Sequence, residues 1–229
     1  FNYIPKNYEI PNNIDYFHCT SNNTIYGTQI KNFPICKTHL VCDMSSDIFS
    51  RKIDVRKFGL IYAGAQKNMG PAGTTLVIVK NEILGKTNRK IPTMLNYQTH
   101  INGKSMFNTP PVFPIYVSML TLKWIKEQGG VSVIEKRNIK KAKLLYSEID
   151  RNSLFTGTAL SEDRSLMNIC FLLNDESKED TFDKMCEDAG INGIKGHRSV
   201  GGYRASVYNA MPIESIKVLV DLMRTLEKN

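Results

Sequence analysis

Residues 58–79 read FGLIYAGAQKNMGPAGTTLVIV, and this stretch decides the fold class. Two apolar runs, residues 60–63 and 74–79, have the length and composition of buried strands. A loop of mostly small residues lies between them and carries a single charge, that of Lys67. A further short apolar run, residues 40–42, precedes this stretch. Short buried strands joined by connections indicate an α/β sheet that is covered on both faces.

Lys67 is the only charged residue between Lys57 and Lys80. An ammonium group among apolar residues is costly to keep charged, and a lysine without its extra proton is a nucleophile toward aldehydes and ketones. The alternative is a lysine that reaches water from a strand end, as most lysines do. Asp43 also follows an apolar run, and ligands of α/β sheets collect at the carboxyl ends of strands. We therefore expect Lys67 and Asp43 to share a site.

The C-terminal half of the chain predicts a second, smaller unit. A mostly apolar helix begins after Pro110-Pro111 and ends before two glycines, an arrangement that favours a helix start and a helix end. Another helix with an apolar stripe follows it. The elements expected beyond that are a strand over residues 167–173, a helix over 179–189, extended segments over 191–195 and 205–208, and a terminal helix from Pro212. This alternation indicates an α+β unit with helices on one side of a small sheet.

The totals describe an ordinary globular chain of 229 residues, with 41% hydrophobic and 23% charged residues. We expect no membrane segment and no signal peptide. The 5 cysteines are scattered and form no C-x-x-C pair, which favours reduced thiols in a cytoplasmic protein over disulfides or a metal site. The net charge of +8 favours anionic partners. The densest cationic run, residues 135–143, has a helical pattern and is interpreted as a solvated face, so we expect no nucleic-acid binding.

Three polar clusters complete the candidate site. Residues 21–24 form a turn whose hydroxyl and amide groups could bind a ring oxygen or a phosphate. Residues 105–111 combine a hydroxyl, an amide and a helix start, which is typical of an anion site and also of an ordinary helix start. Residues 195–204 place glycines beside arginines, which bind carboxylates and phosphates, although a plain basic loop would look the same. With Lys67 and Asp43, these groups suit pyridoxal phosphate, and they equally suit a Schiff-base aldolase.

Longer motifs decide between these interpretations. The stretches are YAGAQKNMGPAG (residues 62–73), SMFNTPP (105–111), GHR (196–198), GGYRAS (201–206) and YNAMP (208–212). They closely resemble the phosphoserine aminotransferase family of class-V pyridoxal-phosphate enzymes, in its bacterial form. The resemblance extends over the chain from about Tyr16.

The resemblance implies a fold-type-I pyridoxal-phosphate transferase. Residues 1–137 would be the C-terminal portion of the large, mostly parallel α/β domain, and residues 138–229 the small α+β C-terminal domain. The family is cytoplasmic and homodimeric, with active sites shared between subunits. Its members interconvert 3-phosphohydroxypyruvate plus glutamate with O-phospho-L-serine plus 2-oxoglutarate in serine biosynthesis. Many bacterial members also act on 4-phosphohydroxythreonine in pyridoxine biosynthesis.

Cofactor-binding roles also follow from the resemblance. Lys67 would form the Schiff base with pyridoxal phosphate, and Gln66 would contact the cofactor. Asp43 would pair with the pyridinium nitrogen, and Thr24 would bind the cofactor. Asn108 and Thr109 would reach the cofactor phosphate of the partner subunit.

Substrate-binding roles come from the C-terminal motifs. Arg204 would bind the substrate α-carboxylate. His197 and Arg198 would bind the substrate phosphate or the distal carboxylate of glutamate, across the subunit interface. No metal is expected.

The family carries a longer N-terminal part than this chain. That part holds a Gly-Arg phosphate-binding turn, an aromatic residue that stacks on the cofactor ring and an arginine for the substrate phosphate. We therefore expect an incomplete cofactor pocket, and little or no activity if the 229 residues are the entire molecule. An inactive fragment and another class-V enzyme, such as a cysteine desulfurase, are the alternatives, although the paired GHR and GGYR motifs favour a phosphate-bearing substrate.

Overall fold

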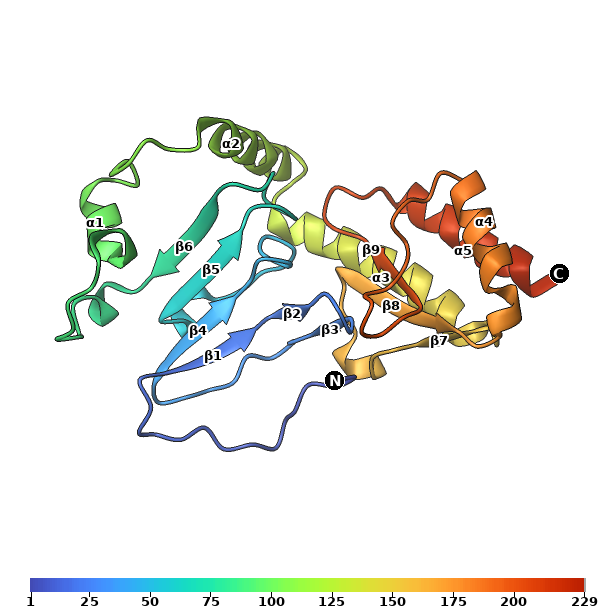
Figure 1. Cartoon of the computed structure of the whole chain (residues 1–229), viewed down its shortest axis with the longest axis horizontal. Coiled ribbons are helices and arrows are strands. Elements are labelled where there is room, and N and C mark those ends of the chain that lie inside the picture. Colours follow the sequence, from blue (N-terminus) through green and yellow to red (C-terminus); the bar gives the residue numbers. More distant parts are fainter. Residues whose placement is uncertain (229) are drawn as a thin grey trace.

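The computed structural model describes residues 1–228 as two parts, and the helix α3 (Val131–Arg151) leads the chain from the first part into the second (Figure 1). The first part contains a 4-stranded sheet with the helices α1 (Tyr97–Asn102) and α2 (Val112–Glu127). The second part contains a 3-stranded sheet with the helices α4 (Glu179–Asp188) and α5 (Ile213–Lys228). No helix among the described residues combines the length and the apolar character that a membrane crossing requires.

The larger sheet has the strand order β1-β4-β5-β6. Its strands are β1 (Tyr16–Thr20), β4 (His39–Asp43), β5 (Leu60–Gly64) and β6 (Thr75–Val79). β1, β4 and β5 run parallel, and β6 pairs antiparallel with β5. The α/β class and the strands expected around residues 40–42, 60–63 and 74–79 are confirmed. A short hairpin of β2 (Asn22–Asn23) and β3 (Thr28–Gln29) follows β1 directly.

Burial of this sheet is one-sided within residues 1–228. On β4 the side chains of Leu40 and Cys42 are buried, whereas His39, Val41 and Asp43 on the opposite face are only half-buried. The expectation of cover on both faces is therefore not met by the described residues. The packed face contributes to a core of Leu40, Cys42, Met44, Ile48, Phe58, Ile61, Ala63, Ala65 and Met69.

The helix α2 packs over the loop between β5 and β6. A Cβ atom on Gly70 would lie 2.6 Å from Ser118 Oγ, so only glycine allows this approach without a shift. After Glu127 the chain turns through Gly129 (φ 99°) and Gly130 (φ 80°), backbone conformations that favour glycine. The predicted start and end of this helix are confirmed.

The smaller sheet consists of β7 (Phe155–Gly157), β8 (Asn168–Leu173) and β9 (Tyr203–Ser206), all antiparallel. The helices α3, α4 and α5 share a core with it that includes Leu145, Ile149, Ile169, Phe171, Phe182, Tyr203, Leu219 and Met223. The β2–β3 hairpin lies against this unit: Ser165 N donates to Gly27 O at 2.8 Å, and Thr158 Oγ1 donates to Tyr26 O at 2.9 Å. The hairpin that follows β1 is thus in direct contact with the second part of the molecule.

Several elements differ from the sequence-based expectation. Residues 191–195 form no strand and make only one isolated bridge, between Lys195 and Tyr203. β9 begins at Tyr203, two residues before the expected start, because it pairs along β8 from Phe171 to Asn168. The short elements β7 and α1 were not predicted, and neither were the 3-10 turns η1 (Val55–Lys57), η2 (Asn81–Ile83), η3 (Thr93–Leu95), η4 (Ser161–Asp163) and η5 (Glu176–Lys178). The domain boundary near Arg137 stays a prediction, and α3 continues through it.

Candidate active site

The predicted cofactor residues gather at one edge of the larger sheet. Thr20 of β1 pairs with Asp43 of β4, and Asp43 pairs with Tyr62 of β5. Because these three strands are parallel, the segments that follow them leave the sheet side by side. Those segments carry Thr24, the Asp43 turn and Lys67. Asp43 and Lys67 thus follow adjacent parallel strands at one edge of the sheet, and the expectation that they share a site stays a prediction.

Lys67 lies in a tight turn directly after β5. Its backbone N–H donates to Ala65 O at 2.7 Å, and Gly70 N donates to the same oxygen at 2.7 Å. Ala65 N in turn donates to Thr74 O at 3.0 Å, which closes the loop at its base. The side chain is half-buried, and among residues 1–228 its amine is engaged in no hydrogen bond or ion pair. The neighbouring Gln66 is exposed.

Asp43 is oriented by the turn that follows it. Its Oδ1 atom accepts a hydrogen bond from Ser45 N at 2.8 Å, and Ser45 Oγ accepts one from Gly64 N at 3.0 Å. The last residues of β4 and β5 are thus tied together below the loop that carries Lys67. On the same face, Tyr62 OH lies 3.0 Å from His18 Nε2. Burial and the adjacent Asp43 carboxylate raise the pKa of Tyr62, so its phenol stays protonated at neutral pH.

Arg204 reaches from the small sheet to the hairpin that carries Thr24. Its Nη1 atom donates to Thr24 O at 3.0 Å. The Nε atom of the same guanidinium is buried and has no hydrogen-bond partner in the described part of the chain. An unpaired buried donor of this kind is costly, so Arg204 retains capacity for an anionic ligand.

A buried network of polar side chains joins the segments that follow β1 and β4. Asp47 accepts hydrogen bonds from Ser21 Oγ, from Gln29 Nε2 at 3.0 Å and from Arg51 Nη2 at 3.3 Å. Asn22 Nδ2, one residue after Ser21, donates to Ser46 Oγ at 2.8 Å. The sequence analysis did not identify these supporting residues, because a buried Asp, Asn or Ser has the same local signature as a turn residue.

Four predicted residues are not brought to Lys67 by this chain. His197 is half-buried and Arg198 is exposed, in a loop where His197 Nδ1 lies 2.7 Å from Ser199 Oγ. Asn108 and Thr109 are exposed before α2, and the only side-chain hydrogen bond there joins Asn108 Nδ2 to Thr109 O at 3.1 Å, within residues 1–228. Their assignment across a subunit interface stays a prediction.

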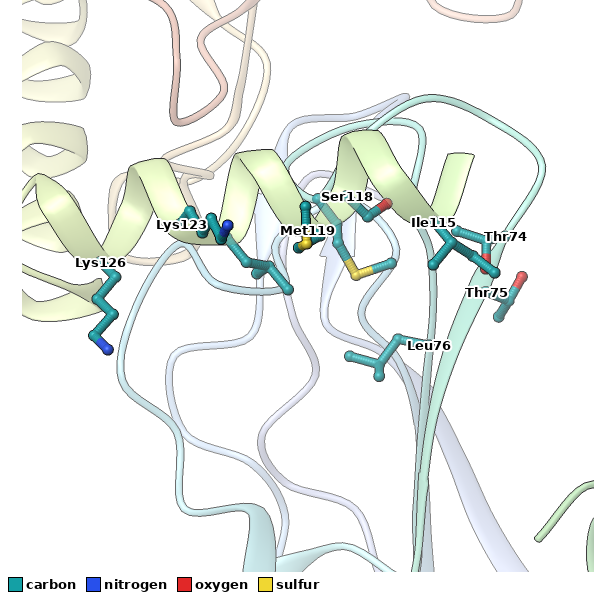
Figure 2. Close-up of a pocket in the computed structure, with 10 residues that line it drawn as sticks. Thr74, Thr75, Leu76, Ile115, Ser118, Met119, Lys123 and Lys126 are labelled. Atoms are coloured by element: carbon teal, nitrogen blue, oxygen red, sulfur yellow. The ribbon is translucent and has the colours of Figure 1, made fainter. Parts of the chain in front are cut away.

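A cavity of about 500 Å³ lies beside the candidate site, beneath α2. Figure 2 shows Ile115 and Met119 pointing from the helix toward Thr74, which precedes β6, and Leu76 within β6. The lining is mostly apolar, with Lys123 and Lys126 from the same helix at its margin. None of the predicted cofactor or substrate residues lines this cavity.

Comparison with known proteins decides the family. A family model described as aminotransferase class-V matches residues 6–219. The chain belongs to the class-V aminotransferase family. Class-V aminotransferases depend on pyridoxal phosphate, so the aldolase alternative is set aside.

Individual relatives in the class-V family agree with this placement. The chain is 68% identical to a phosphoserine aminotransferase from Flavobacterium psychrophilum over 99% of this chain and 64% of that protein. It is 61% identical to one from Parabacteroides distasonis over 100% of this chain and 65% of the relative. The chain therefore spans somewhat less than two thirds of the length of these relatives.

Solved structures of family members superpose closely. A phosphoserine aminotransferase from Bacillus circulans subsp. alkalophilus matches with a TM-score of 0.92 and 47% identity, over 96% of this chain and 62% of that one. A pyridoxal-phosphate-bound phosphoserine aminotransferase from Trichomonas vaginalis matches with a TM-score of 0.89 and 36% identity, over 95% and 62%. The fold-type-I α/β class predicted from the sequence is thus confirmed.

The residues present fit part of the family's cofactor. Lys67 offers an uncommitted amine, Asp43 an oriented carboxylate and Arg204 an unpaired buried N–H, all at or beside one sheet edge. These groups suit an aldehyde, a protonated ring nitrogen and an anionic substrate group. Within residues 1–228, the predicted phosphate ligands Asn108 and Thr109 are exposed and form no hydrogen bond with the Lys67 loop.

Proposed function

We propose that this chain forms the larger part of a phosphoserine aminotransferase, which transfers an amino group between phosphoserine and 2-oxoglutarate. The observation that carries the proposal is the placement of Asp43 and the Lys67 loop at the ends of adjacent parallel strands, with Arg204 held against Thr24. Relatives that are 58% to 68% identical and named phosphoserine aminotransferase support the substrate class.

The residues near the sheet edge divide the cofactor chemistry among them in this proposal. Pyridoxal phosphate, when bound, supplies an aldehyde that takes up the amino group and a ring that accepts electrons from the reacting carbon. Lys67 would hold that aldehyde through Nζ and would accept the proton that leaves the substrate α-carbon. Asp43 holds a proton on the ring nitrogen through its negative charge. Thr24 and Gln66 contact the cofactor and fix its orientation.

Anion recognition explains how one site serves two substrates. Arg204 binds the α-carboxylate that phosphoserine and glutamate share. His197 and Arg198 bind the group in which they differ, the phosphate of one and the side-chain carboxylate of the other. Asn108 and Thr109 bind the cofactor phosphate of a second subunit, so the active protein is a homodimer. The family resemblance further supports a cytoplasmic location. The same anion sites would accept 4-phosphohydroxythreonine, which adds a role in pyridoxine biosynthesis.

Covalent attachment of the cofactor tests the proposal directly. Pyridoxal phosphate is added to the protein, the mixture is reduced with borohydride, and the modified lysine is located by mass spectrometry. We expect attachment at Lys67, none there in Lys67→Ala, and normal attachment in Lys57→Ala, which removes an exposed lysine just before β5. Absence of any attachment would refute the enzyme assignment for this chain and support the inactive-fragment alternative.

Turnover then tests the substrate class. In the full protein that carries this chain, we expect Arg198→Ala to lose phosphoserine turnover while Lys67 still binds the cofactor. Unchanged phosphoserine turnover in that variant would contradict the role of Arg198. Release of sulfur from cysteine would favour a cysteine desulfurase instead.

A further inference from the structure

A cluster of three asparagines, Asn68, Asn138 and Asn209, lies buried where the two parts of the molecule meet. Asn68 follows Lys67, Asn138 belongs to α3, and Asn209 lies in the loop between β9 and α5. Their exposed fractions are 3%, 0% and 6%, respectively. Most buried amide groups are hydrogen-bonded, so their partners indicate what the cluster holds in place. Among these three side chains, only Asn138 Oδ1 is buried without a partner within residues 1–228.

The three asparagines form a chain of hydrogen bonds that ends at Asn68, the residue after Lys67. Asn138 Nδ2 donates to Asn209 Oδ1 at 2.8 Å, and Asn209 N donates to Asn68 Oδ1 at 3.0 Å. The Nδ2 group of Asn68 makes only weak contacts, a long one of 3.4 Å to Ser46 O and one of 3.5 Å to Met167 Sδ, since a thioether sulfur is a weak acceptor. The bond from Asn209 is therefore the principal tether of the Asn68 side chain.

The same cluster also grips the turn that follows Asp43. Asn209 Nδ2 donates to Phe49 O at 3.1 Å, and Asn138 Nδ2 donates to Ser50 O at 3.1 Å. Phe49 has φ 58°, a left-handed conformation that is unfavourable for a bulky residue and persists only when its surroundings impose it. Both catalytic turns, after β4 and after β5, are thus fastened to one loop of the small sheet.

That loop is itself held rigidly by Lys141 of α3. The Lys141 side chain is buried, and its Nζ atom donates to Val207 O at 3.0 Å, to Tyr208 O at 2.7 Å and to Met211 O at 3.1 Å. Three carbonyls on one ammonium fix the loop on both sides of Asn209. Because the loop is held rigidly, Asn209 can fix the position of the Asn68 side chain, which a mobile loop could not do.

We propose that Asn68 is a positioning residue that sets the Lys67 amine for its reaction, through the hydrogen bond from Asn209. The proposal rests on the proposed function, because it assigns the reactive role to Lys67. Without the tether, the turn between Ala65 and Gly70 keeps its own backbone hydrogen bonds but loses its fixed orientation toward the small sheet. A displacement of the reacting amine by about 1 Å lowers a rate by roughly 100-fold.

The decisive experiment compares Asn68→Ala with Asn152→Ala. Asn152 is an equally buried asparagine (1% exposed) whose amide donates to Glu148 Oε1 and to Met223 O, away from the sheet edge. Both variants lose a buried amide and are expected to lose similar stability. Only Asn68→Ala should slow cofactor attachment to Lys67, by roughly 10- to 100-fold, and lower kcat while leaving KM within about twofold.

A second readout needs no cofactor. The rate of acetylation of Lys67 by acetic anhydride is measured by mass spectrometry at one pH, with the exposed Lys57 as internal reference, because Lys67 is half-buried. We expect the Lys67 rate of Asn68→Ala to move toward that of Lys57, and the Lys67 rate of Asn152→Ala to match the wild type. An unchanged ratio of the Lys67 and Lys57 rates in Asn68→Ala overturns the inference, whereas failure of the wild type to bind the cofactor overturns only the proposed function.

Asn138→Ala keeps the inference testable if Asn68→Ala does not fold. It removes the donor to Asn209 Oδ1 without changing the Lys67 turn itself, and it should move the Lys67 acetylation rate in the same direction by a smaller amount. If both fold, the double variant should be non-additive in Lys67 reactivity, because the two residues share Asn209 as partner. Additive effects, or an effect of Asn138→Ala on stability alone, would contradict positioning through the cluster.

Discussion

Replacing Gly27 by alanine probes how tightly the Thr24 hairpin packs on the small sheet. Gly27 has φ 74°, and a Cβ atom there would lie 2.9 Å from Asn168 O and 3.2 Å from Cys170 Sγ. The left-handed conformation costs an L-residue about 1–2 kcal/mol. Forcing a methyl group against backbone adds about 1–3 kcal/mol, because the carbonyl of a central strand cannot move aside. We therefore expect Gly27→Ala to lower the free energy of unfolding by about 2–5 kcal/mol.

Gly85→Ala is the matched control for this substitution. Gly85 has φ 67°, close to that of Gly27, but a Cβ atom added there would have no neighbouring atom within 4 Å. Gly85→Ala should lower the free energy of unfolding only by the cost of the left-handed backbone conformation, about 1–2 kcal/mol. Urea unfolding followed by circular dichroism measures both variants, and the difference of about 1–3 kcal/mol corresponds to a Tm gap of about 2–12 °C. Equal costs would refute the close contact between the hairpin and β8.

The Gly27 substitution also has a consequence for the site. A hairpin pushed off β8 carries Thr24 away from Arg204, whose Nη1 donates to Thr24 O at 3.0 Å. Gly27→Ala should therefore raise KM for both amino-group donors, and Gly85→Ala should not. A Gly27→Ala protein that is destabilised but has unchanged KM would show that Arg204 keeps its position without the hairpin.

Three further substitutions test the small sheet and the anion site. Burial alone would raise the pKa of Glu148, but hydrogen bonds from Arg151, Asn152 and Arg224 outweigh it and hold that pKa below the usual 4.5. As the pH falls, the unfolded chain binds this proton before the folded one, so the stabilisation is present above about pH 4.5 and is lost as the pH falls through the folded pKa. Glu148→Gln should lower the free energy of unfolding by about 1.5–3 kcal/mol at pH 7 and make stability depend less on pH in acid. An acid-unfolding curve as steep as that of the wild type would contradict the assignment. Leu145→Ala (0% exposed) should cost about 2–5 kcal/mol in urea unfolding, against less than about 0.5 kcal/mol for Leu120→Ala (43% exposed). Arg204→Lys keeps the charge but loses the planar pair of donors, so steady-state kinetics should show KM raised about tenfold for phosphoserine and glutamate alike, rather than for one of them.

Elements with a strong local pattern are predictable from the sequence. β4, β5 and β6 are short apolar runs, and α2 is framed by prolines and glycines, so each signal lies within the element itself. The predicted start of β9 is wrong by two residues because its limits are set by pairing with β8, more than thirty residues earlier in the chain. Residues 191–195 look extended but find no neighbouring strand apart from one bridge. Registers of this kind depend on contacts that no local pattern records.

In the candidate site, too, some contacts can be predicted from the sequence and others cannot. Asp43 and Lys67 can be placed together because the ends of adjacent parallel strands meet at one edge. The contact between Arg204 and Thr24 joins residues that are 180 positions apart, and spacing alone gives no indication of it. Family resemblance supplies the role of Arg204, and the structure adds the carbonyl it binds. The asparagine cluster escapes prediction because a buried asparagine and a turn asparagine have the same sequence signature.

The cationic run of α3 shows most clearly why charge counts mislead. The pattern of residues 135–143 predicts a solvated face, and for Lys141 that prediction is wrong: its side chain is buried and satisfied by three backbone carbonyls. Lys141 lies three residues after the buried Asn138 and four before the buried Leu145, so it shares their face of the helix. Burial lowers its pKa to about 8. A lysine within a charged run can thus be buried when backbone carbonyls of a loop replace water as its hydrogen-bond acceptors. The loop that Lys141 binds also contains Asn209, which donates to Asn68 in the Lys67 turn.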